Sequence, residues 1–248
     1  MRYKLGNKGT ETMKNILSSI KRHVFQMFRA PKTVRQCPIC DWRGRQFAPG
    51  GHPLKRRFDS RCPNCGSMER HRLAFLVAEK CVALDYSSVI HVAPEKELSK
   101  WLQSKSGNYL SIDLYADAMA KMDLTDLDLE GNSQSLIWAA HVLEHIVDDR
   151  KAISELYRVL APKGIAFIQV PIWRMKTFED FSISNPQERL ESFYQEDHVR
   201  LYGLDIMDRF QQTGFSAAVH RAQDFGPEVL LRNGLSFAST DEVFVFQK

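Results

Sequence analysis

Four of the five cysteines form two Cys-x-x-Cys pairs, and 21 residues separate Cys40 from Cys62. Each pair stands on a tight turn that contains proline or glycine, so the pairs can present four thiolates tetrahedrally to Zn²⁺. A closed four-sulfur site has no open position for chemistry and instead stabilises a core too small to fold alone. Cys81 lies on an apolar helical stretch and is predicted to be a buried core residue. The spacing thus predicts a structural zinc site formed by Cys37, Cys40, Cys62 and Cys65.

Basic and aromatic residues surround the cysteine pairs and leave two interpretations open. They can bind RNA phosphates and stack on bases, or they can pack against a neighbouring domain. The residues concerned are Arg43, Arg45, Lys55, Arg56, Arg57, Arg61, Arg70, His71 and Arg72, with Trp42, Phe47 and Phe58 among them.

A second concentration of reactive groups places an acid, a base, a cation and a phenol within six residues: Asp197, His198, Arg200 and Tyr202. Arg200 suits a carboxylate or phosphate, and His198 can accept a proton near neutral pH. Surface salt bridges are the alternative for both. The group lies in a long polar stretch, from 174 to 203, of the kind that forms functional loops over an active site.

The elements that position these groups are clearest between Ser135 and Pro171. An apolar run at 136–140 is followed by an amphipathic segment that Asp148 or Asp149 opens and Gly164 follows, and a second apolar run occupies 165–170. This alternation predicts a βαβ unit and therefore a parallel sheet.

Composition indicates one large α/β domain with a small appendage. The 248 residues have a net charge of +4, but residues 1–80 contain 18 Lys or Arg and 5 Asp or Glu, which gives +13. Residues 81–248 contain 16 and 25, which gives −9. The basic part can therefore meet an anionic partner or the acidic remainder of its own chain.

Paired cysteines and the lack of a long apolar run or signal segment favour a soluble, cytoplasmic protein. Residues 12–29 read as a basic amphipathic helix that docks on the protein or, alternatively, lies on an anionic membrane.

The sequence between Ser135 and Pro171 contains HVLEHI followed by ELYRVLAPKGIAFIQVP. These residues closely resemble class I S-adenosylmethionine-dependent methyltransferases of the type 11 domain. The resemblance covers about residues 89–248 and is nearest to the branch that includes small-molecule and quinone-pathway enzymes. It implies a Rossmann-like seven-stranded sheet with helices on both faces, here with an N-terminal zinc ribbon. The expected organisation is a tail and helix at 1–30, the ribbon at 31–72, and the methyltransferase domain at 73–248 with a substrate-binding insertion at 174–203.

The resemblance also implies a set of residues that bind S-adenosylmethionine. Where the family has a glycine-rich loop after its first strand, this chain has Ala93-Pro94-Glu95, so backbone amides there and at the following helix start must serve instead. Asp113 is expected to accept from the ribose hydroxyls. The full expected set is His91, Ala93, Pro94, Glu95, Asp113, Leu114, Asp123, Leu124 and His141.

Three polar residues, His141, Glu144 and His145, follow the fourth strand of the expected sheet. Their spacing resembles a metal site in quinone-pathway methyltransferases, although hydrogen bonding around the helix start is the alternative. His198 and His141 are the candidates for the base that deprotonates the acceptor.

The expected activity is methyl transfer from S-adenosylmethionine to an oxygen or nitrogen of a small-molecule or saccharide acceptor, which Asp197, Arg200 and Tyr202 would contact. Two alternatives stay open. One is an RNA methyltransferase that holds RNA on the basic ribbon, and the other is a non-catalytic zinc-binding interaction protein with a degenerate methyltransferase fold.

Overall fold

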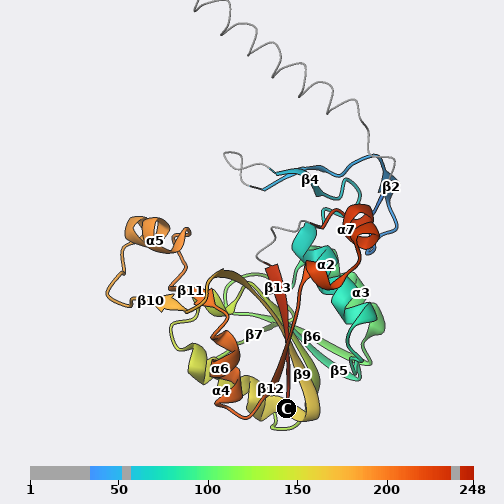
Figure 1. The fold of residues 1–248 in the computed structure, drawn as a ribbon. Helices are drawn as coiled ribbons and strands as arrows, with labels where there is room; N and C mark the ends of the chain where they lie inside the picture. The colour runs from blue at the N-terminus through green and yellow to red at the C-terminus, as the bar shows by residue number, and fades with distance from the viewer. Residues whose placement is uncertain (1–33, 52–56, 236–240) are drawn as a thin grey trace, which may run out of the picture.

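Seven strands of the main sheet run in the order β7, β6, β5, β8, β9, β13, β12 in a computed structural model that describes residues 34–51, 57–235 and 241–248 (Figure 1). The first five are parallel to one another, and β13 is antiparallel to both β9 and β12. Their bounds are β5 (Ser88–Val92), β6 (Asn108–Asp113), β7 (Ala120–Lys121), β8 (Gln134–Ala140), β9 (Leu160–Arg174), β12 (Ser216–His220) and β13 (Asp241–Gln247). The expected Rossmann-like fold is confirmed.

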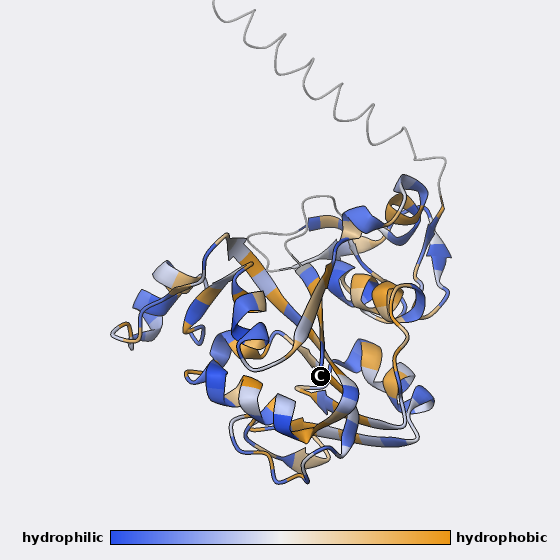
Figure 2. Cartoon of the chain, turned by 60° about the horizontal axis from the view of Figure 1, so that its bottom comes forward, coloured by the Kyte–Doolittle hydropathy of each residue, from blue (hydrophilic) through white to orange (hydrophobic). Residues whose placement is uncertain are grey.

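Helices cover both faces of this sheet because both faces are apolar. One core cluster joins α4 (Asp149–Val159) and α6 (Ile206–Gln211) to residues such as Ile137 and Phe244. The other joins α2 (Glu69–Lys80), α3 (Lys96–Lys105) and α7 (Pro227–Asn233) to Trp138 and Phe167, whose rings stack at 4.0 Å. The central strands are accordingly mostly orange in Figure 2, while the surrounding helices carry blue on their outer sides.

The predicted βαβ unit is present, with Asp148 as the residue that caps its helix. The Asp148 carboxylate accepts from the Lys151 amide at 2.9 Å, and α4 then buries Ala152, Ile153 and Leu156. A short 3-10 helix, η2 (Leu143–His145), connects β8 to this helix.

The segment expected as a polar insertion contains regular structure. It forms β10 (Phe178–Glu179), α5 (Pro186–Phe193) and β11 (Arg200–Gly203), which extend to one side of the sheet in Figure 1. β11 pairs in parallel with the last residues of β9 and antiparallel with β10, so the sheet described has nine strands.

Residues 34–51 and 57–61 contribute two small antiparallel strand pairs near α2 and α7 (Figure 1). The strands are β1 (Arg35–Gln36), β2 (Arg43–Gly44), β3 (Ala48–Gly50) and β4 (Arg57–Arg61). Another short 3-10 helix, η3 (Ala222–Asp224), precedes α7.

Cys81 follows the last residue of α2 and is exposed, so the expectation of a buried core cysteine is wrong. The helix expected at 12–29 lies outside the described residues. Within the described part of the chain, no helix combines the length and apolar character needed to cross a bilayer.

Candidate active site

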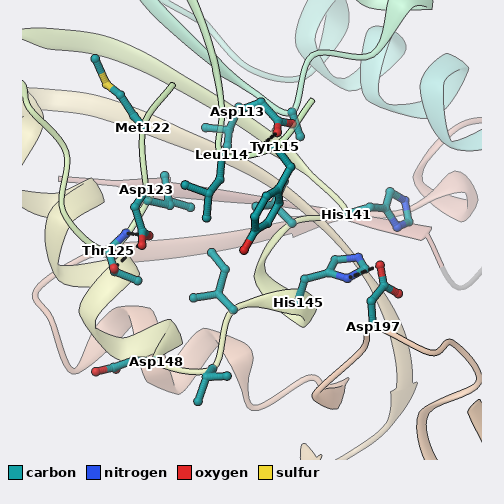
Figure 3. A pocket seen from close by; sticks show the side chains of 16 residues that line it. Asp113, Leu114, Tyr115, Met122, Asp123, Thr125, His141, His145, Asp148 and Asp197 are labelled. Atoms are coloured by element: carbon teal, nitrogen blue, oxygen red, sulfur yellow. Dashed lines mark hydrogen bonds and ion pairs between the residues drawn. The ribbon is translucent and has the colours of Figure 1, made fainter. Parts of the chain in front are cut away.

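A cavity of about 670 Å³ opens at the carboxyl edge of the parallel strands (Figure 3). β5, β6 and β8 end together there, because Val92 is in register with both Ile112 and Ala139. In a doubly wound sheet this edge is where ligands bind. The fold therefore brings Ala93, Asp113 and His141 around one space although they are far apart in the sequence.

Two non-glycine residues at this edge have left-handed backbone conformations. Ala93, directly after β5, has φ of 47°, and His141, directly after β8, has φ of 56°. Both line the cavity. A side chain in this region of φ/ψ space is strained, and such residues cluster at functional sites. Ala93 thus takes the turn that glycine favours, and its amide donates to the Ile112 carbonyl at 2.9 Å.

Two aspartates along the cavity are each held through one oxygen. Asp113 Oδ1 accepts from the amides of Tyr115 and Ala116 at 2.7 and 2.6 Å. Asp123 Oδ1 accepts from the amide and hydroxyl of Thr125 at 2.8 and 2.9 Å, a contact drawn in Figure 3. In both carboxylates the second oxygen is left to accept from a ligand.

Six of the nine residues expected to bind the cofactor line this cavity: Ala93, Asp113, Leu114, Asp123, Leu124 and His141. The other three, His91, Pro94 and Glu95, do not. His91 is fully buried, with Nδ1 2.9 Å from the Tyr109 hydroxyl and Nε2 3.1 Å from Glu95. Burial raises the pKa of Glu95, but the hydrogen bond from His91 and nearby positive charges outweigh it, and the net pKa is lowered.

A second cavity, of about 440 Å³, adjoins the first and shares His141 and His145 with it. Its other walls come from α2, β9 and the insertion: Arg70, Glu144, Pro171, Trp173, Phe193, Tyr194, Gln195 and His198. The rings of Trp173 and Tyr194 lie 4.9 Å apart. Trp173 and Tyr194 could not be assigned to this site from the sequence, and Arg70 was expected to belong to the ribbon. Only the fold brings α2, the end of β9 and the insertion together.

His198 and Asp197 occupy different cavities. His198 lines the second cavity, and its Nδ1 lies 3.1 Å from the Phe193 carbonyl oxygen. Burial lowers the pKa of His198. Asp197 lines the first cavity and places Oδ2 3.3 Å from His145 Nδ1 (Figure 3).

Arg200 and Tyr202 line neither cavity, in contrast to the expectation that they contact substrate. Both are buried in β11. The guanidinium of Arg200 donates to the Leu143, Ile146 and Val147 carbonyls and pairs with Glu179 at 3.0 Å. The Tyr202 hydroxyl donates to Asp149 at 2.5 Å, and burial raises the pKa of Tyr202 far above its usual value. These side chains hold the loop between β8 and α4, whose residue Val147 lines the first cavity.

The four paired cysteines meet in one cluster. Cys37 Sγ is 3.7 Å from Cys65 Sγ, and Cys40 Sγ is 3.6 Å from Cys62 Sγ. A tetrahedral site with zinc–sulfur bonds of about 2.3 Å separates its sulfurs by about 3.8 Å. The two turns are equivalent, since Asp41 and Gly66 follow the second cysteine of each pair with φ of 57° and 82°. The geometry is compatible with a four-thiolate zinc site.

Several basic residues of the ribbon are engaged within the protein. Arg35 pairs with Asp59 at 2.6 Å, and Arg57 pairs with Glu69 at 3.1 Å. Arg72 is fully buried over the Phe47 ring. The charge of this region is therefore partly compensated inside the molecule, as the packing interpretation requires.

Known proteins with a similar sequence pattern or a similar fold are methyltransferases. The family model described as "Methyltransferase domain" matches residues 65–168. No curated protein matches the sequence. Among solved structures, an S-adenosylmethionine-dependent methyltransferase from Mesorhizobium loti has a TM-score of 0.53 at 11% identity and covers 71% of this chain and 98% of its own.

Two further structures are similar at a TM-score of 0.50. One is a chain of the Haloferax volcanii complex that contains the Trm112 methyltransferase activator, with 13% identity over 71% of this chain and 88% of that one. The other is an S-adenosylmethionine-dependent methyltransferase from Archaeoglobus fulgidus, with 13% identity over 74% of this chain and 95% of that one. Residues 65–168 thus match a methyltransferase domain, and the fold of the chain is that of solved S-adenosylmethionine-dependent methyltransferases.

Proposed function

We propose that the protein transfers a methyl group to an oxygen or nitrogen of a small-molecule or saccharide acceptor. The observation that carries this proposal is that the second cavity meets the first at His141 and His145. One cavity then holds the cofactor, and the other holds an acceptor beside it. Aromatic and charged walls on a cavity of about 440 Å³ suit a small polar molecule.

The first cavity suits S-adenosylmethionine in shape and in its polar groups. The free oxygen of Asp113 can accept from the ribose hydroxyls, and that of Asp123 can accept from the adenine amino group. The left-handed turn at Ala93, which glycine would adopt readily, lines this cavity where the expected glycines are missing. When bound, the cofactor supplies a methyl group that its sulfonium already activates, so the protein's tasks are alignment and proton removal.

The candidates for the base are His141 and His198. His141 lines both cavities, so it lies where an acceptor and the cofactor would meet. His198 lines the acceptor cavity, and its bond to the Phe193 carbonyl leaves Nε2 to take a proton. Of His141→Ala and His198→Ala, the variant that removes the base should abolish turnover while cofactor binding persists. His220→Ala is the matched control.

Cofactor binding can be measured before any acceptor is identified. At a hundred times its dissociation constant, a ligand stabilises the folded state by about 2.7 kcal/mol. S-adenosylmethionine and its demethylated product should therefore give saturable thermal shifts that Asp113→Ala removes. No shift at millimolar ligand would contradict the proposal.

The cysteine cluster is proposed to hold a structural zinc ion. Its four thiolates occupy all the positions of a tetrahedral site, so the ion would stabilise the ribbon and take no part in the transfer. Elemental analysis should find about one zinc at this site, and Cys40→Ser should remove it. A zinc content unchanged by Cys40→Ser would contradict the assignment.

A further inference from the structure

Glu144 is a buried carboxylate without a hydrogen-bond partner in the described part of the chain. Its exposed fraction is 1%, and neither Oε1 nor Oε2 has a partner. His141 Nδ1 lies 3.3 Å from Oε1, which is an ion-pair distance only when that imidazole is protonated. A carboxylate removed from water requires a cation or several donors. The arrangement around Glu144 therefore indicates a positively charged ligand.

Two imidazoles lie around the same point. One ligand atom each from Glu144, His145 and His198 fall within 4.8 Å of one another. Glu144 and His145 belong to η2, whereas His198 comes from the insertion just before β11. The Val199 amide donates to the Glu144 carbonyl at 3.0 Å, which fixes the two segments against each other. This set differs from the one the sequence suggested, because His198 joins it in place of His141.

Both imidazoles have an oxygen near Nδ1. His198 Nδ1 is hydrogen-bonded to the Phe193 carbonyl oxygen at 3.1 Å, and His145 Nδ1 lies at ion-pair distance, 3.3 Å, from Asp197 Oδ2. Because a carbonyl oxygen can only accept, it selects the His198 tautomer with a proton on Nδ1 and leaves Nε2 as a ligand, and the Asp197 carboxylate favours the same tautomer of His145. Histidines that bind metals nearly always have an outer contact of this kind.

We infer that Glu144, His145 and His198 bind one divalent transition-metal ion. Two imidazoles and one carboxylate suit zinc, manganese, iron or cobalt, whereas magnesium prefers oxygen ligands alone. Three protein ligands leave a position open, and all three residues line the second cavity. On the proposed function, that open position would receive the acceptor's oxygen or nitrogen. The ion would lower the pKa of that group, and His141 rather than His198 would then remove its proton.

The test counts ions on the full-length, zinc-loaded protein after equilibrium dialysis against manganese(II) or cobalt(II). Manganese is useful because it does not favour thiolates and so leaves the ribbon zinc in place. The wild type should bind about one such ion per chain in addition to the ribbon zinc. Glu144→Gln and His198→Gln should each abolish this binding, with ribbon zinc and melting behaviour showing that both variants are folded.

A graded variant separates a metal site from a general loss of structure. Asp197→Asn keeps all three ligands but weakens the contact that orients His145, so affinity should fall by about 10- to 100-fold. Glu196→Gln is the matched control, since Glu196 is the adjacent exposed carboxylate and belongs to neither contact. Its affinity should equal that of the wild type.

Absence of a second ion on the wild type would overturn the inference, and it would point to the acceptor's own ammonium group as the partner of Glu144. Binding that survives Glu144→Gln would overturn it as well. The ion count requires neither cofactor nor acceptor, so it can fail while cofactor binding succeeds, and the reverse also holds.

Discussion

Ala93 and His141 show how single residues shape the candidate active site without a recognisable motif. Each follows a buried central strand, and each has the positive φ that glycine would adopt without strain. The loop at 93–95 lacks the glycines of the family that the sequence resembles, and residue types alone do not reveal that Ala93 adopts a left-handed turn. Backbone conformation depends on the strands that enter and leave the turn, and residue type alone does not reveal it.

Replacement of Ala93 by glycine should stabilise the protein. The left-handed conformation costs a non-glycine residue about 1 kcal/mol, and glycine avoids this cost. We expect Ala93→Gly to raise the free energy of unfolding by up to about 1 kcal/mol in urea titrations. Ala140→Gly, one residue before His141 and within β8, is the control and should lower it by a similar amount. A loss of stability in Ala93→Gly would contradict the strain argument.

His71 should make stability depend on pH. Burial, reinforced by the charge of Arg70, lowers the pKa of His71 to about 4. The unfolded chain, with a histidine pKa of about 6.5, binds more protons below that pH, so stability is complete above pH 6.5 and declines as the pH falls toward 4. At pH 5.5 the loss should be about 1.4 kcal/mol relative to pH 7.5.

His71→Asn should remove the pH dependence of stability that His71 causes. An asparagine side chain can still accept a hydrogen bond from the Met68 amide, but it does not titrate. Urea titrations at pH 7.5 and pH 5.5 measure the change in the free energy of unfolding, with His220→Asn as the control. An equal change in the wild type and in His71→Asn would show that His71 is protonated in the folded protein.

At the scale of elements, the βαβ unit could be predicted from sequence, and β11 could not. The helix α4 has a capping aspartate and a regular apolar stripe, which are both local signals, whereas its end at Val159 is followed directly by β9, in which Gly164 lies. β11 consists of Arg200-Leu201-Tyr202-Gly203, a strand with a cation and a phenol that are both buried. Those polar groups find their partners in η2 and α4, more than 50 residues away, so the burial is a tertiary effect.

Arg200 is expected to be the residue on which the loop between β8 and α4 depends. A lysine cannot reach the three carbonyls of Leu143, Ile146 and Val147 together, since the guanidinium fork spans them and an ammonium does not. Arg200→Lys should lower the free energy of unfolding by about 3 kcal/mol. It should also weaken cofactor binding, because Ile146 and Val147 line the first cavity.

Urea titration and cofactor thermal shifts measure the two effects separately. Arg150→Lys is the control, since the Arg150 side chain is exposed and its guanidinium donates to the exposed Gln212 side chain, so its effect should stay within about 0.5 kcal/mol. Wild-type stability in Arg200→Lys would show that the loop does not require the guanidinium.

Across the whole molecule, the buried guanidinium of Arg72 joins the ribbon to the methyltransferase domain. It donates to the carbonyls of Ser60 and Ser67 in the ribbon and to those of Asn233 and Gly234 at the end of α7. The cysteine spacing could be recognised from sequence, but this connection could not, because Asn233 lies 161 positions after Arg72. The ribbon and the sheet should therefore unfold together.

Opening of the cysteine cluster, with loss of the zinc ion proposed there, should consequently destabilise the entire protein. Ser67 carries one of the Arg72 acceptors, and its hydroxyl lies 3.3 Å from Cys37 Sγ and 3.2 Å from Cys65 Sγ. If the cysteine cluster opens, Arg72 is left buried with fewer partners, a change worth about 3 kcal/mol. Cys40→Ser should then lower the melting temperature by about 6–12 °C in calorimetry, since 1 kcal/mol corresponds to about 2–4 °C at this size.

The transition should remain single, and Cys81→Ser should match the wild type because Cys81 is exposed and outside the cluster. Two separate transitions, or an unchanged melting temperature in Cys40→Ser, would instead make the ribbon an independent module that Arg72 only touches.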